Sequence, residues 1–126
     1  MKRLAMAAVL LCTAFASLAS TRAETKNYNY SCFEINTGKV MVLNSGPDLL
    51  GGANFWLKFD NGAQVAIERA APVDIEGRPG FFHPEEGDNE ALIVIVLNNG
   101  SKLVTKYGGR MYTCGLMDEF NVVDYK

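Results

Sequence analysis

The chain has 126 residues, of which 48% are hydrophobic and 21% are charged, a balance typical of a globular protein rather than a disordered one. Its 12 basic residues are scattered and are outnumbered by 14 acidic residues, which argues against nucleic-acid binding. The net charge is −2.

The N-terminus has the layout of a secretory signal peptide. Lys2 and Arg3 form a positive region, residues 4–18 are apolar, and Thr21-Arg22-Ala23 places small residues three and one before a cut. A membrane anchor is the competing interpretation, but the apolar stretch is short for a span of about 20 residues, and no stop-transfer charges follow it. We therefore predict a signal peptide over residues 1–23 and a periplasmic location.

Residues 24–126 then form one small domain without a transmembrane segment. Loss of the three basic residues of the signal peptide leaves nine bases against 14 acids, a net charge near −5 that disfavours nucleic acid and anionic lipid. Cys32 and Cys114 are the cysteines of this domain, and in an oxidising compartment they pair with each other. Two free thiols or a bridge between chains are the alternatives. The sequence does not indicate the oligomeric state.

Short strand-like runs separated by turns fill the domain, and no stretch has the 3.6-residue periodicity of a helix. Alternation is clear in Ala53–Phe59, where Phe55, Leu57 and Phe59 share one face. The other runs cover residues 28–34, 39–43, 63–69, 91–97, 102–107 and 110–116. We predict an all-β fold, a small antiparallel meander that curls into a barrel and so removes its open edges. Cys32 and Cys114 lie in its first and last strands, where a disulfide would fix the closure.

Residues 70–90 break this rhythm, because they contain three prolines, three glycines and many charged residues. We predict a long loop here with a short strand at Phe81-Phe82. Long structured loops in compact domains often carry function, and a tolerated insertion is the alternative.

No catalytic constellation is visible. His83 is the single histidine, and the chain has neither a nucleophile elbow nor metal-binding spacings of cysteine or histidine. Asp74 and Glu76 are weak candidates for paired carboxylates, since nothing in the sequence would perturb them. We predict a binding protein that uses no metal or cofactor, and not an enzyme.

The two ends of the domain carry a further pattern. An aromatic-x-Cys strand, Tyr30-Ser31-Cys32, precedes a Gly turn and a Val-rich strand, and Tyr112-Thr113-Cys114 follows a second hairpin. This pattern resembles the c-type lysozyme inhibitors of Gram-negative envelopes, the MliC/PliC family. The resemblance implies a small antiparallel barrel.

The resemblance also implies a mechanism, in which two loops enter the cleft of a c-type lysozyme and contact its catalytic carboxylic residues. Glu76 stands near the expected serine of the first loop, and Asn99 stands where the second loop should carry a lysine. Arg78 or Lys102 would have to supply the missing cation. The expected partner-binding residues are Asp74, Glu76, Gly77, Arg78, Asn99 and Lys102.

An alternative function keeps the same barrel without inhibition. In that case the domain binds another envelope component, a surface partner or itself through aromatic residues such as Trp56, Phe81 and Phe82. For each of these three, packing in the core is the commoner role.

Overall fold

The computed structural model describes residues 22–125, so residues 1–21 of the predicted signal peptide lie outside the described part. The elements are β1 (Arg22–Glu34), β2 (Val40–Pro47), β3 (Ala53–Phe59), β4 (Gln64–Ile75), β5 (Arg78–His83), β6 (Leu92–Leu97), η2 (Asn98–Gly100), β7 (Lys102–Tyr107) and β8 (Arg110–Tyr125). One compact unit comprises Lys26–Phe120, and the described ends of the chain, residues 22–25 and 121–125, belong to a second one. The loops and cavities described below belong to Lys26–Phe120. Among the described residues there is no helix with the length and apolar character needed to span a bilayer.

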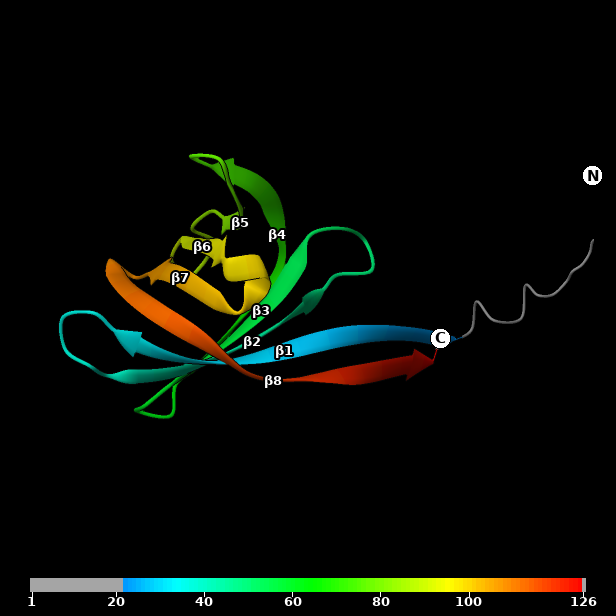
Figure 1. Cartoon of the computed structure of the whole chain (residues 1–126), viewed down its shortest axis with the longest axis horizontal. Coiled ribbons are helices and arrows are strands. Elements are labelled where there is room, and N and C mark those ends of the chain that lie inside the picture. The colour runs from blue at the N-terminus through cyan, green and yellow to red at the C-terminus, as the bar shows by residue number, and fades with distance from the viewer. Residues whose placement is uncertain (1–21, 126) are drawn as a thin grey trace, which may run out of the picture. The chain divides into compact units, whose positions relative to one another are not determined.

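The strands form a closed antiparallel barrel in which each one pairs with its neighbours in sequence (Figure 1). Hairpin pairs such as Leu43 with Leu57, and Val94 with Thr105, fix the register between successive strands. The first and last strands close the barrel, and the backbone N–H of Ile35 donates to the carbonyl of Met111 at 2.9 Å. The predicted all-β meander barrel is therefore confirmed.

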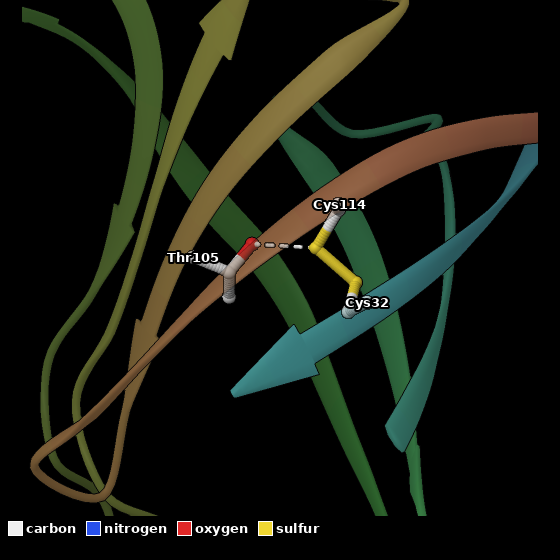
Figure 2. Close-up of a disulfide and its surroundings, with 3 residues drawn as sticks. All are labelled: Cys32, Thr105 and Cys114. Atoms are coloured by element: carbon white, nitrogen blue, oxygen red, sulfur yellow. Dashed lines mark hydrogen bonds between the residues drawn. A yellow bond between two sulfur atoms is a disulfide. The ribbon is translucent and has the colours of Figure 1, made fainter. Parts of the chain in front are cut away.

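The disulfide between Cys32 and Cys114 joins β1 to β8 across this closure (Figure 2). The two Cα atoms are 4.0 Å apart although 82 residues separate them in sequence. Both cysteines are buried, and the hydroxyl of the fully buried Thr105 lies 3.7 Å from the sulfur of Cys114. The predicted pairing within the chain is confirmed, and the alternatives of free thiols or a bridge between chains are excluded.

The core follows from the two-residue period of the strands. In β3, Ala53, Phe55 and Leu57 point inward and are buried, whereas Trp56 and Lys58 point outward and are exposed. Full burial of an aliphatic side chain stabilises the fold by roughly 1.5–3 kcal/mol. The largest fully buried side chains are those of Met41, Leu43, Leu57, Leu92, Val94, Thr105 and Cys32.

The prediction of a long loop over residues 70–90 is wrong for most of its length. Residues 70–75 continue β4, residues 78–83 form β5, and the two strands make a hairpin in which Ile75 pairs with Arg78. The pair that flanks a two-residue turn is hydrogen-bonded, and hydrogen-bonded and non-hydrogen-bonded pairs alternate along an antiparallel ladder. Pro72 and Pro79 therefore belong to non-hydrogen-bonded pairs, where the β4–β5 ladder needs no backbone N–H. The predicted strand at Phe81-Phe82 is real but is the second half of a longer one.

Alternating strand directions bring three connections to one end of the barrel. They are residues 48–52 between β2 and β3, the turn Glu76-Gly77 between β4 and β5, and residues 98–101 between β6 and β7. We call this end the rim. Residues 35–39, 60–63, 84–91 and 108–109 connect the strands at the opposite end.

Candidate binding site at the barrel rim

The two loops in which the resemblance places partner-binding residues both belong to the rim. β5 and β6 are neighbours, with Gly80 opposite Ile95, so the strand that leaves the first loop runs beside the strand that enters the second. Lys102 pairs with Leu97 at the end of β6. The topology therefore brings together loops that are more than 20 residues apart in the sequence.

The turn of the β4–β5 hairpin is held by its own side chains. Glu76 has φ of 52° and Gly77 has φ of 84°, which matches a type I′ turn, in which both central residues have positive φ. The backbone N–H of Gly77 donates to the Asp74 carboxylate at 2.7 Å. Asp74 thus stabilises the turn, while Glu76 and Arg78 are exposed at its tip.

The β6–β7 loop is held in place by hydrogen bonds, one of them from a side chain inside the barrel. Asn98, Asn99 and Gly100 all have positive φ, and the backbone N–H of Ser101 donates to the carbonyl of Asn98 at 3.2 Å. The hydroxyl of the buried Tyr30 donates to the carbonyl of Gly100 at 2.6 Å. The loop is therefore fixed in place, with the side chain of Asn99 exposed.

The position of Tyr30 inside the barrel also perturbs the pKa of its hydroxyl. Burial of its hydroxyl, and secondly the neighbouring Tyr28, raise the pKa of Tyr30 above its ordinary value. The phenol therefore remains protonated at physiological pH and serves as a hydrogen-bond donor.

A partly open cavity of about 480 Å³ lies inside the barrel next to the rim. Tyrosines of β1, Phe55 of β3 and Phe81 of β5 form its aromatic walls, and Phe55 and Phe81 meet edge to face with ring centres 5.6 Å apart. The full lining is Tyr28, Tyr30, Ser45, Gly46, Pro47, Gly52, Ala53, Phe55, Phe81, Val94, Val96, Asn99, Gly100, Ser101, Leu103, Leu116 and Glu119. Of the predicted site residues, only Asn99 reaches this cavity.

The sequence did not reveal the cavity or two apolar residues at the rim. Leu49 and Leu50 are exposed, Leu50 to 79%, in the loop that follows the cavity-lining Pro47. That segment, Asn44-Ser45-Gly46-Pro47 and onward, carries turn residues. The signal that the sequence offered for these exposed apolar residues was a pair of adjacent leucines beside turn residues.

His83 lies away from the rim, beside a polar cavity of about 450 Å³ at the edge of β4. Its Nδ1 is 2.8 Å from the carbonyl of Pro84, and its Nε2 is 3.5 Å from the exposed carboxylate of Glu86. Within residues 22–125 there is no cluster of three His, Cys, Asp or Glu residues that would hold a metal ion.

The aromatic residues of the alternative function divide between inside and outside. Phe81 faces the barrel interior, whereas Trp56 is 53% exposed and Phe82 is 38% exposed. A cluster of exposed apolar residues lies on the outer face of the barrel, near the end opposite the rim. It consists of Phe33, Ile35, Val40 and Met111, with Phe33 directly opposite Val40 across the β1–β2 ladder. We call these four residues the outer patch.

These features define a class, a small eight-stranded antiparallel barrel closed by one disulfide and hollow at one end. No family model matches the chain, and neither a curated protein nor a solved structure matches it.

Proposed function

We propose that this protein is an exported, periplasmic inhibitor of c-type lysozyme that blocks the cleft of the enzyme with the rim. The observation that carries the proposal is the position of the two loops, the turn around Glu76-Gly77 and residues 98–101, at the same end of a rigid barrel. Both loops are held by internal hydrogen bonds, so little conformational entropy is lost on binding.

Charge supports a cationic partner. The domain after the predicted signal peptide has a net charge near −5, and opposite net charges raise the rate of encounter with a basic enzyme. Arg78 and Lys102 are exposed cations at the rim, suited to contact the catalytic carboxylic residues. Glu76 is the unfavourable element, because a carboxylate facing carboxylates is repelled or takes up a proton.

The test is a lysis assay. The full chain, expressed with its own N-terminus and purified from the periplasmic fraction, should slow peptidoglycan lysis by hen lysozyme. Glu76→Ser should strengthen inhibition, while Arg78→Ala and Lys102→Ala should weaken it. Arg110→Ala is the matched control, because Arg110 is an exposed cation at the opposite end of the barrel. Unimpeded lysis at a large molar excess of the parent protein would remove the proposal.

Export has a separate readout. N-terminal sequencing of the purified protein should begin at Glu24 if residues 1–23 are removed as predicted. A chain that keeps Met1 would contradict cleavage without affecting the lysis result.

A second candidate function is a barrel of the same shape that binds another envelope or surface partner, or itself. The exposure of Trp56 and Phe82, together with the outer patch, favours it, because contiguous exposed apolar side chains mark interaction surfaces. Sedimentation velocity of the parent and of a Phe33→Ser variant tests self-association. A monomer at all concentrations, with no difference between the two proteins, would eliminate this form of the candidate.

A further inference from the structure

The interior of the rim cavity is almost purely apolar. Its buried lining residues are Tyr30, Gly46, Ala53, Phe55, Val94 and Leu103. Tyr30 is the single member with a polar side chain, and its hydroxyl already donates to the carbonyl of Gly100. A polar molecule inside would find no free side-chain donor in these walls. Burial of a polar group without hydrogen bonds is costly.

The cavity exists because one wall is built from small residues. Ser45, Gly46, Gly52 and Ala53 of β2, β3 and their connection form this wall, and Ser45 lies directly beside Tyr28 across the β1–β2 ladder. A Cβ on Gly46 would meet the side-chain amide of Asn27 at 2.5 Å, and one on Gly52 would meet the backbone carbonyl oxygen of Ala70 at 2.4 Å. An eight-stranded barrel is just wide enough to be filled by side chains or to hold one small ligand, and small residues here leave the space open.

The cavity mouth is partly polar but carries little charge. Asn99 and Ser101 are its exposed polar residues, Pro47 and Leu116 its exposed apolar ones, and Glu119 is the single charged residue of the lining. Lys26 neutralises Glu119 through an ion pair of 3.2 Å. A carboxylate or phosphate monoester at the mouth would therefore find no cation among the lining residues, whereas hydroxyl groups would find hydrogen-bond partners.

We infer that the cavity binds the hydrocarbon chain of a single-chain amphiphile with an uncharged, hydroxyl-rich head group. The chain would enter from the rim and pack between the aromatic walls, and the head group would remain at the mouth. A volume of about 480 Å³ lies within the roughly 300–1,000 Å³ of small-molecule sites. This site goes beyond lysozyme inhibition, and its test contains no lysozyme, so the two succeed or fail separately.

The experiment uses the full chain with 1-N-phenylnaphthylamine, a neutral fluorophore that brightens in apolar sites. Its fluorescence should rise and saturate at one molecule per chain. Dodecyl maltoside, kept below its micelle concentration, should displace it, and laurate should displace it about tenfold more weakly, because the anionic head group lacks a partner. A rise that does not saturate, or equal displacement by laurate, would overturn the proposal.

Two variants test whether the ligand binds in the cavity. Ala53→Phe adds bulk to a buried residue of the small wall, and it should weaken fluorophore binding about tenfold or more. Ala66→Phe is the matched control, because Ala66 is exposed on β4 outside the cavity, and it should bind like the parent. Equal binding by both variants would overturn the assignment.

A second measurement needs no variant and covers the case in which Ala53→Phe does not fold. In methyl NMR spectra of the parent, dodecyl maltoside should shift the signals of Val94, Val96 and Leu103. The signals of Val40 on the outer patch should stay unchanged. Shifts confined to Val40 would place the amphiphile on the outer surface and overturn the proposal.

Discussion

Removal of the disulfide should cost this barrel a large part of its stability. Cys32 and Cys114 close a loop of 82 residues between the first and last strands. In the loop-entropy model a cross-link of this length stabilises the native state by about 4–5 kcal/mol, through restriction of the unfolded chain. A domain of this size typically has only about 5–15 kcal/mol of unfolding free energy. The double variant Cys32→Ala/Cys114→Ala should therefore approach the limit of stable folding.

Urea unfolding followed by far-UV circular dichroism measures this loss. The midpoint should fall strongly in the double variant, and the slope of free energy against urea should rise, because an unfolded chain without the cross-link exposes more surface. Addition of dithiothreitol should lower the midpoint of the parent and leave that of the double variant unchanged. A double variant within about 1 kcal/mol of the parent would refute the stabilising role of the bridge.

Three further substitutions have defined outcomes in the same assay. Thr105→Val should raise the unfolding free energy by about 1 kcal/mol, because the buried hydroxyl of Thr105 has only the weak sulfur acceptor of Cys114. Tyr30→Phe should lower it by about 1 kcal/mol through loss of the hydrogen bond to Gly100. Because the pKa of Tyr30 is raised in the folded state, the parent should lose stability as the pH rises above about 10, and Tyr30→Phe should reduce that loss. Glu76→Asn should add about 0.5–1 kcal/mol, because Asn tolerates positive φ better than Glu.

The barrel and its closure were predictable because their signals are local and repeated. Alternation in Ala53–Phe59 specifies which face is buried, and turn residues such as Asp60-Asn61-Gly62 mark where the chain reverses. A meander needs no information about distant pairing, since each strand pairs with the next one along the chain. The cysteines in the outermost strands then supplied the one distant contact.

The composition of residues 70–90 does not predict the β4–β5 hairpin, because the hairpin depends on the positions of its prolines. Pro72 and Pro79 look incompatible with strands, yet each sits where the β4–β5 ladder requires no N–H. Pairing between β5 and β6 begins at Gly80, directly after Pro79, so this proline also ends that ladder. The strand assignment depended on register, which the sequence alone does not specify for a hairpin rich in proline.

The cavity was not predictable for a different reason. Ser45 and Ala53 look like ordinary strand residues, and only the closed barrel gathers them in one cavity with Phe81 and Leu116. Whether small residues on one wall leave a void depends on the size of the side chains on the other wall, which is a property of the tertiary structure. The exposure of Trp56, by contrast, follows from the alternation in Ala53–Phe59, which points its side chain outward.

Glu76 is a strained residue at the rim, and its variants report on which kind of group the rim binds. Of the four described non-glycine residues with positive φ, Glu76, Asn98 and Asn99 lie in rim loops, and Glu76 is the rim residue whose type tolerates this conformation poorly. A left-handed residue costs roughly 1–2 kcal/mol, so Asn or Gly at position 76 would be more stable than Glu76. In a lysozyme cleft its carboxylate is a hindrance, and Glu76→Ser then raises inhibition. If the rim instead binds a partner through a cationic group, Glu76→Ser and Glu76→Asn both weaken that binding while Glu76→Asn makes the barrel more stable. Stability and binding measured on the same two variants therefore decide which partner the rim is built for.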